Sequence, residues 1–496
     1  MADFVRQTTI FGELERELPP GLVELEAFLD TLSEFDEELV RELERERWRI
    51  DDLGERRIRG KGRDDLPVRA MWNLLATSLF LRNGKQSETL AELRRNSDMA
   101  RLLGFREIGP NEYRLPSSSA LSRFHVKLQG NAADDSAGAS NSRTRNLFDK
   151  TVDALSAEDP DFGRDTAFDA SDTRSHARPR RVKFSELSNK EREKYDLGEV
   201  DASNESDRVL VSSDNEASWS VKSKIIETKD GQKTKKTQGT FGYKTYFGVD
   251  VEVGGVLAVE VETGSYPDQE AAVPLIRDAQ ARLPEGRMQT VSLDKGFDSE
   301  ENVLEISELG IDPIIPFRDV PENLEKLPSE DREVPLTPGG NIVRDKYTGE
   351  VACYDKSKAG GELERRTLTY AGRELDRGTH KFRCPLGAQA REACPFFASC
   401  SAGSAGVQGR QIRVPFSTDI RRFAPVYPKS KRWRRLYNGR SAVERAFSYA
   451  KDVLPLERHA LRGKKAIELR ALLAAITINV RVLMLRRRAE SQAAAA

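Results

Sequence analysis

The chain is poor in cysteine and histidine and has no long uncharged apolar run. Four cysteines in 496 residues are too few for a fold that depends on disulfides. The apolar run near the C-terminus, 471–480, is much shorter than the roughly 20 residues that span a bilayer. Lys and Arg (80) nearly balance Asp and Glu (81), and 38% of the residues are hydrophobic. These features exclude a membrane protein, a collagen and a wholly disordered chain.

The near-zero net charge conceals two oppositely charged ends. Residues 1–50 carry 14 acidic and 6 basic side chains, whereas residues 410–496 carry 21 basic and 6 acidic ones. A basic end of this kind favours a polyanion as partner, although a solvated basic helix face would give the same count. The first residues do not show the basic region followed by an apolar region that is typical of a secretory signal peptide, so we expect a soluble, cytoplasmic protein.

The first 130 residues show helical periodicity. Apolar residues recur at helical spacing between 68 and 79, and the serines at 117–119 are suited to cap a further helix. We therefore predict an N-terminal all-α domain over 1–130. Its arginines Arg94, Arg95 and Arg123 would suit a DNA-binding helix-turn-helix, but a plain helical bundle would have the same pattern. Residues 131–165 are predicted to be a polar linker and a helix.

Residues 166–317 alternate between strand and helix patterns. We predict a short strand at 166–169, a mostly irregular insertion over 171–239, and a β-hairpin over 243–261 that turns at Gly254-Gly255. A helix at 268–283, a strand at 290–293, a helix opened by a capping box of Asp298 and Glu301, and a strand at 313–316 follow. This order predicts an α/β core with a mixed sheet.

The remaining chain divides into two parts. Over 318–415 strand and helix patterns no longer alternate, and all four cysteines fall in this range. We interpret this range as a Cys-containing insertion. Residues 416–496 comprise a basic run and two closing helices at about 437–453 and 465–487. The last helix is strongly apolar, so it should pack in the core.

Three carboxylates are candidates for catalysis. Asp169 and Asp294 follow short apolar strands, and Glu444 lies on the predicted helix 437–453. The ends of strands are where α/β sheets place their chemistry, and Mg²⁺ binds through one or two carboxylates together with substrate phosphates. A single aspartate at a strand end more often caps a turn, so the argument depends on the combination.

The polar residues of the predicted helix 437–453 fall on one stripe. On an ideal helix Tyr437, Arg440, Glu444 and Lys451 lie within about 60° of one another. Such a stripe suits a metal-and-phosphate site, in which Glu444 binds the ion while the arginine and lysine bind phosphate. Surface pairs on a helix would explain the same spacing.

The spacing Tyr437-x2-Arg440-x3-Glu444-x6-Lys451 resembles the Tyr-Arg-Glu-Lys signature of insertion-sequence DDE transposases. Residues 168–173 and 293–298 resemble the first- and second-aspartate motifs of that family, and the strands from Gly242-Tyr-Lys244 onward resemble its second and third strands. The first motif departs from the family pattern at Ala170, which leaves Asp172 as the alternative first aspartate. The resemblance covers 66–130 loosely and 165–488 more specifically.

The resemblance implies a ribonuclease-H-like mixed sheet with flanking helices, interrupted by the insertion, in which Asp169, Asp294 and Glu444 hold two Mg²⁺ (or Mn²⁺) ions. It also implies a DNA transposase that cleaves and transfers strands at the ends of its own insertion sequence. The expected partners are terminal inverted repeats, target DNA and a second copy in a synaptic homodimer, on the nucleoid of a prokaryotic cell. Two rival functions remain: a DNA-binding protein without catalysis, and a ribonuclease-H-like nuclease without strand transfer.

Two further groups of residues are candidates for binding. Cys353, Cys384, Cys394 and Cys400, with His380 as a substitute for the first, are enough ligands for one structural zinc ion. They contain no paired CxxC, so four reduced thiols are the alternative. The run 410–440 has ten basic residues and one acidic residue interleaved with aromatics, a composition typical of a DNA-backbone groove. The predicted DNA-binding residues are Tyr437, Arg440, Lys451, Lys244, Arg432, Trp433 and Arg434.

Overall fold

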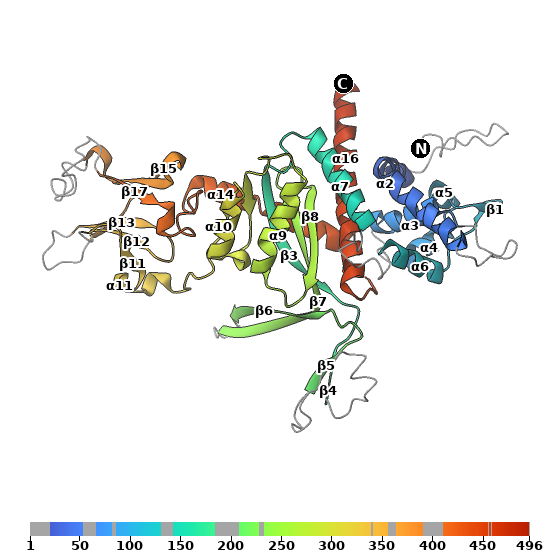
Figure 1. Cartoon of the computed structure of the whole chain (residues 1–496), viewed down its shortest axis with the longest axis horizontal. Helices are drawn as coiled ribbons and strands as arrows, with labels where there is room; N and C mark the ends of the chain where they lie inside the picture. Colours follow the sequence, from blue (N-terminus) through green and yellow to red (C-terminus); the bar gives the residue numbers. More distant parts are fainter. Residues whose placement is uncertain are drawn as a thin grey trace. The chain divides into compact units, whose positions relative to one another are not determined.

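The computed structural model describes most of the chain (Figure 1). The described residues are 20–52, 66–81, 86–129, 142–183, 208–227, 233–338, 341–355, 364–389, 410–454, 456–457 and 459–495. The chain divides into two compact units: unit 1 comprises 1–162, 170–266 and 443–496, and unit 2 comprises 163–169 and 267–442. Among the described residues, no helix is long and apolar enough to cross a membrane.

Unit 1 begins with helices that pack around a buried ionic contact. The elements are α2 (Pro20–Asp52), α3 (Val68–Phe80), α4 (Gln86–Leu93), α5 (Ser97–Leu102), a short hairpin of β1 (Glu107–Gly109) and β2 (Glu112–Tyr113), and α6 (Ser118–Leu128). Helix α3 is buried almost all round, which is typical of a central helix. The buried carboxylate of Asp36 on α2 accepts hydrogen bonds from Arg69 and from the Trp72 indole of α3, so the two helices are joined by a fully partnered charge.

The C-terminal helix is the core helix of unit 1. Helix α16 (Lys464–Ala495) packs against α7 (Ser142–Glu158) and against strand β8 (Val256–Thr263). Its buried Asn479 donates to the Thr151 hydroxyl and to the Val256 carbonyl, and accepts from the Val256 N–H at 2.7 Å. Because a buried amide is favourable only when its groups are paired, this residue fixes the positions of all three elements. The prediction of a buried closing helix is confirmed.

One six-stranded mixed sheet contains the strand that carries Asp169 and the strand that Asp294 follows. Its order is β10-β9-β3-β7-β6, and β8 also pairs with β7. Its strands are β3 (Asp165–Arg174), β6 (Ser218–Glu227), β7 (Lys233–Asp250), β8, β9 (Thr290–Ser292) and β10 (Asp312–Ile314). The pairs β3–β9 and β9–β10 are parallel, whereas β6–β7 and β7–β8 are antiparallel. Parallel neighbours need crossover helices, which α9 (Asp268–Ala281) and α10 (Glu300–Glu308) supply. The predicted mixed α/β core is confirmed.

The interpretation of 171–239 as mostly irregular is wrong for the residues of this range that the structure describes, 171–183, 208–227 and 233–239. Strand β3 continues to Arg174, β4 (Arg180–Lys183) pairs with β5 (Arg208–Val211), and β6 pairs with the first half of β7. Strands β4 and β5 have only four residues each, and the first half of β7 is rich in lysine and threonine, so these segments show little of the alternation that marks a strand with one buried face. Hydrophobic periodicity therefore could not reveal them.

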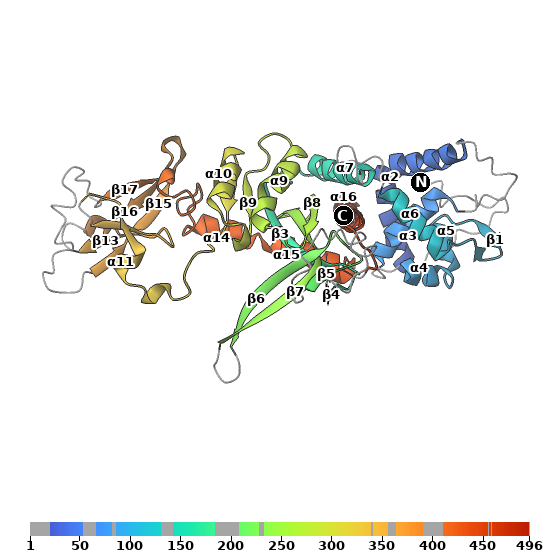
Figure 2. The same ribbon diagram turned by 60° about the horizontal axis from the view of Figure 1, so that its bottom comes forward.

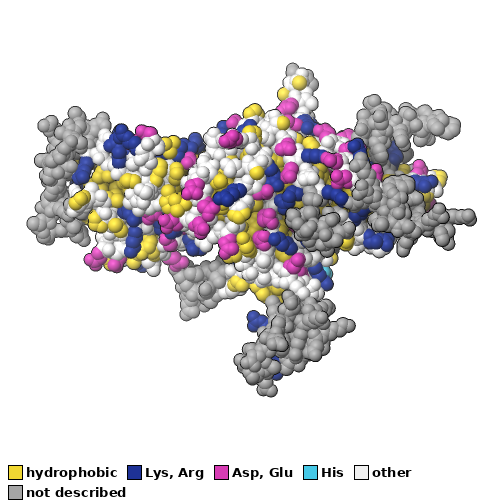
Figure 3. Space-filling view, in the orientation of Figure 1, with side chains coloured by type: hydrophobic (Ala, Val, Ile, Leu, Met, Phe, Trp, Pro, Cys, Tyr) yellow, Lys and Arg dark blue, Asp and Glu magenta, His cyan; other side chains and the backbone are white. Residues whose placement is uncertain are grey.

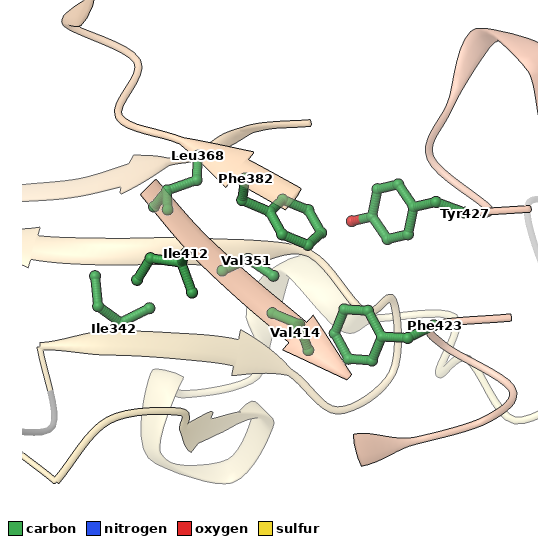
Figure 4. Packing of buried hydrophobic residues seen from close by; sticks show 8 residues of the cluster. All are labelled: Ile342, Val351, Leu368, Phe382, Ile412, Val414, Phe423 and Tyr427. Atoms are coloured by element: carbon green, nitrogen blue, oxygen red, sulfur yellow. The ribbon is translucent and has the colours of Figure 1, made fainter. Parts of the chain in front are cut away.

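Unit 2 contains a β-rich region with its own core. Strands β11 (Glu333–Pro335), β12 (Ile342–Asp345), β13 (Val351–Asp355) and β14 (Glu364–Thr367) form one sheet, and β15 (Thr369–Glu374), β16 (Thr379–Arg383) and β17 (Gln411–Pro415) form another. Figure 4 shows the shared core: Ile342, Val351, Leu368, Phe382, Ile412, Val414, Phe423 and Tyr427. We predicted only a loss of α/β rhythm here, because strands of three to six residues are too short to show a clear period.

Candidate functional site

The first pair of candidate carboxylates lies on neighbouring parallel strands of unit 2. The register pairs Asp165 with Thr290 and Ala167 with Ser292, so Asp169 and Asp294 each lie two residues beyond the last pair. Adjacent strands are about 4.8 Å apart, and parallel strands carry residues off the same end. The two aspartates therefore share one edge of the β3–β9 pair. Asp169 does not end its strand as predicted, because β3 continues beyond it.

The loop that carries Asp294 is folded back on itself. The Asp294 carboxylate accepts the Gly296 N–H and caps a 3₁₀ turn, η3 (Lys295–Phe297). A Cβ at Gly296 would lie 2.9 Å from Asp294 Oδ1. Any larger residue at position 296 would therefore displace the Asp294 carboxylate. The neighbours Leu293 and Phe297 are buried. The backbone and the two apolar anchors thus fix the Asp294 side chain at the strand end.

The same loop is supported by an ion pair between the buried Asp298 and Arg421, which no sequence motif indicated. The Asp298 side chain is only 1% exposed. It accepts from Arg421 Nε at 2.9 Å and from the Arg318 N–H at 2.8 Å. Asp298 is therefore not the helix cap that we predicted; that role belongs to Ser299, whose hydroxyl accepts from the Asn302 N–H at 3.1 Å.

Arg440 contacts the first aspartate directly. Its Nη1 donates to Asp169 Oδ2 at 2.8 Å, and both side chains are about one-fifth exposed. Its guanidinium also lies 5.9 Å from the centre of the Tyr437 ring. Within unit 2, an arginine of the predicted stripe and a strand carboxylate therefore form one partly desolvated contact, where charge-assisted hydrogen bonds are strong.

The single helix predicted over 437–453 is wrong. The structure has α14 (Lys431–Asn438), a break at Gly439 and Arg440, α15 (Ser441–Ser448) and a π-helical turn, η8 (Tyr449–Val453). The 100° per residue that put the four signature residues on one stripe therefore does not apply along the whole segment. Arg440 lies at the break, where its backbone N–H bonds the Tyr437 carbonyl, and Lys451 lies in the π-helical turn.

Helix α14 presents aromatic and basic side chains. Ser430 caps it by accepting from the Trp433 N–H at 3.1 Å. Trp433 and Tyr437, one turn apart, stack with centroids 4.9 Å apart. The basic side chains of the helix are exposed, namely Lys431, Arg432, Arg434 and Arg435, and Arg432 lies 3.6 Å from Asp312. The predicted residues Arg432, Trp433, Arg434 and Tyr437 therefore share one short helix.

Glu444 lies in unit 1 on a helix held by apolar contacts. The faces of α15 differ sharply: Val443, Ala446 and Phe447 are buried, whereas Glu444 is exposed. The Phe447 ring stacks on Phe247 of β7, with centroids 4.6 Å apart and planes 1° apart. An amphipathic eight-residue helix thus fixes the side of unit 1 from which the Glu444 carboxylate projects.

Asp172 is surrounded by lysines. Its carboxylate pairs with Lys222 of β6 at 2.8 Å, and its backbone carbonyl accepts from Lys451 Nζ at 3.2 Å. Burial raises the pKa of the Asp172 carboxyl, but hydrogen bonds from Lys222 and Ser220 outweigh burial and hold the pKa below its usual value. Residues 169 and 172 are three apart on β3, so their side chains point to opposite faces of the strand. Lys244 donates to the Tyr266 carbonyl at 2.7 Å.

The cysteines are only partly described. Cys353 on β13 packs against the core of the β-rich region, and Cys384 follows β16, while Cys394 and Cys400 lie outside the described residues. His380 cannot replace Cys353 as we suggested: it is fully buried, with Nε2 2.8 Å from the Ala424 carbonyl and Nδ1 3.3 Å from the Tyr370 hydroxyl. Within the described part of the chain, no three His, Cys, Asp or Glu side chains form a ready-made metal site. The zinc site stays a prediction.

Comparison with known families identifies one match. The family model described as "Transposase DDE domain" matches residues 218–480, which is more than half of the chain. The matched range contains Asp294, Glu444 and the whole spacing from Tyr437 to Lys451, whereas Asp169 precedes it. No curated protein matches the chain.

Proposed function

The chain belongs to the DDE transposase family, and from this premise we propose that it cleaves DNA at the ends of its own insertion sequence and joins those ends to a target. Membership of the family implies a phosphoryl-transfer enzyme that acts on DNA. The observation that supports the proposal best is the parallel register of β3 and β9, which brings Asp169 and Asp294 to one edge.

The proposed catalytic residues are Asp169, Asp294 and Glu444. Carboxylate oxygens from neighbouring strand ends are the donors that Mg²⁺ and Mn²⁺ prefer, so the two aspartates fit the divalent ions that transposases of this family use. We propose two such ions, with Glu444 of α15 as the third ligand. When bound, the ions would stabilise charge on the phosphate and lower the pKa of an attacking water.

Arg440 and α14 would bind and orient the DNA. Arg440 already neutralises one oxygen of Asp169, so we propose that its guanidinium orients that carboxylate and contacts the reacting phosphate when DNA is bound. Lys451 and Lys244, with the aromatic and basic residues of α14, are proposed to bind the DNA backbone. These contacts would carry no sequence information.

Three functions are separated by two assays. The substrate is DNA that carries the inverted repeats flanking the gene, and the cofactor is Mg²⁺, with a chelator as control. A transposase should cut this DNA and join the cut ends to a target plasmid, while a nuclease would cut without joining and a DNA-binding relic would do neither. Asp294→Asn should abolish both reactions, and Asp376→Asn, a change at a carboxylate that is 80% exposed, should affect neither. Normal cutting by Asp294→Asn would contradict the assignment.

The assembly is also part of the proposal. Two transposon ends must be held together during joining, so we propose that two copies of the chain act in one synaptic complex. Sedimentation of the protein with and without end DNA tests this: the complex should contain two chains and two ends. A complex of one chain with one end that still joins DNA would contradict it.

A further inference from the structure

We propose that the hairpin strands formed by β6 and the first half of β7, residues 218–227 and 233–242 (the ribbon), are an arm that lies in a groove of the DNA duplex. This inference depends on the proposed function, because that function supplies DNA as the partner. It assigns a binding role to a segment that belongs to neither the carboxylate strands nor α14.

The ribbon is two-stranded over its whole length. Its register runs from Ser218 opposite Gly242 to Glu227 opposite Lys233, and pairing of β7 with β8 begins only at Tyr243. Figure 2 shows β6 and the paired part of β7 extending beyond the other strands. Ten residues per strand correspond to about 33 Å. A two-stranded hairpin alone is marginally stable, but a ribbon of this shape fits the major groove, which is about 12 Å wide.

The charge of the ribbon complements DNA. The two strands of the ribbon contain five lysines and one acidic residue. On the face drawn in Figure 3, acidic and basic side chains are interspersed over the described surface instead of forming one large patch. The ribbon is therefore, like the run 410–440, a basic segment in a chain that is near-neutral as a whole. Lysines that meet phosphates release counterions, and this release drives binding that does not depend on sequence.

Apolar side chains at the base of the ribbon are exposed and rigidly held. Trp219 is 42% and Val221 62% exposed, and both lie on the same face of β6 because they are two residues apart. The Trp219 ring covers Gly239, where a Cβ would lie only 3.0 Å from it, and meets the Phe241 ring edge-on at 5.5 Å. An ordered, half-exposed indole beside an exposed valine is typical of a surface that a partner covers. Thymine methyl groups offer apolar contact in the major groove.

The first experiment tests the lysines. Lys233→Gln/Lys235→Gln/Lys236→Gln is compared with a matched triple, Lys326→Gln/Lys346→Gln/Arg377→Gln, by measuring the affinity for a duplex of arbitrary sequence at several salt concentrations. The ribbon triple should bind all sequences more weakly, and the slope of log K against log salt should flatten by about 0.9 per lost contact. With DNA at saturation, its Mg²⁺-dependent cleavage should be unchanged. Affinity and slope equal to those of the matched triple would overturn the proposal.

The second experiment uses Trp219 as a reporter. Trp433→Phe first removes the indole of α14, which is itself proposed to bind DNA. In this background, adding duplex should still change the tryptophan fluorescence, and the further change Trp219→Phe should lose most of that response. If Trp219→Ser instead alters the oligomeric state and leaves the salt slope of DNA binding intact, the ribbon binds a second copy and the proposal is wrong. A chain whose ribbon binds DNA but which cuts nothing in Mg²⁺ would contradict only the proposed function.

Discussion

The loop that carries Asp294 and the helix that carries Glu444 fix their carboxylates by different physical means. In unit 2, the loop is held by the buried Asp298–Arg421 pair. In unit 1, α15 is held by the stack of Phe447 on Phe247. A buried ion pair is intolerant of losing one partner, because the other charge is left uncompensated. An apolar contact loses stability in proportion to the volume removed. The two regions should therefore respond differently to substitution and to pH.

The largest effect should come from the Glu444 carboxylate itself. Glu444→Gln removes the charge and keeps the shape, so cleavage in Mg²⁺ should fall by several orders of magnitude while DNA binding is retained. Single-turnover cleavage at saturating DNA measures this, with Glu490→Gln on an exposed part of α16 as the matched control. A tenfold loss or less would show that α15 does not supply a catalytic carboxylate, whatever the role of Asp294.

The next largest effect should come from breaking the ion pair beneath Asp294. Asp298→Asn removes the charge of a carboxylate that is only 1% exposed and accepts from Arg421, but Arg421 is one-fifth exposed and keeps Asp319 as a partner. The change should therefore cost about 2–3 kcal/mol of unfolding free energy. Phe447→Leu, the matched change in the other region, should cost clearly less because much of the volume is retained. Urea unfolding measures both variants. Equal costs for the two single changes would contradict the contrast between the regions.

Arg440→Ala should have an intermediate effect. It should lower the rate of DNA cleavage more than it lowers the affinity for DNA. Arg440 touches Asp169 at 2.8 Å, so removing it should lower the cleavage rate by about 10²-fold, as expected for a group that stabilises developing charge. Binding and single-turnover cleavage measured side by side separate the two effects. Lost affinity with an unchanged rate would make Arg440 a backbone contact like those of α14.

The smallest effect should be a difference in how the stabilities of the two units depend on pH below neutral. In unit 1, burial and then the charge of Arg470 lower the pKa of His125 and of His459 to about 4. As the pH falls, these histidines bind protons in the unfolded chain before they do so in the folded chain. The stability that they contribute is therefore full above about pH 6.5 and falls between about pH 6.5 and pH 4.

In unit 2, burial raises the pKa of the Asp345 carboxyl, but hydrogen bonds from Thr348, Arg332 and Tyr347 outweigh it and lower the pKa overall. The stability that the ionised Asp345 carboxylate contributes is present above about pH 3.8. It is lost only as the pH falls through the lower pKa of the folded state. Hydrogen exchange across an acid titration should therefore show unit 1 opening first. The reverse order would contradict this assignment, and His125→Gln/His459→Gln should reduce the difference.

The elements that could be predicted from the sequence are those whose apolar residues recur with a clear helical or strand period. The buried helix α16, the β7–β8 hairpin and the helix α9 each have a clear apolar face, and all were predicted. The ribbon was missed because the alternation in β6 is short, with Trp219 and Val221 as its clear apolar positions, and because residues 233–240 of β7 contain no apolar side chain. The break at Gly439 was missed because the spacing of the four signature residues suggested one helix. Asp298 and Arg421 are 123 residues apart, and nothing local to either residue reveals their pairing.

The most direct test of the account compares two aspartates on one strand. Asp169 shares an edge with Asp294 and bonds Arg440, whereas Asp172 pairs with Lys222. The measurement is Mg²⁺-dependent single-turnover cleavage of end DNA by Asp169→Asn and by Asp172→Asn, with DNA binding followed in parallel. The account predicts that Asp169→Asn binds DNA but loses cleavage by several orders of magnitude, and that Asp172→Asn still cleaves. Normal cleavage by Asp169→Asn together with loss of cleavage in Asp172→Asn would contradict it.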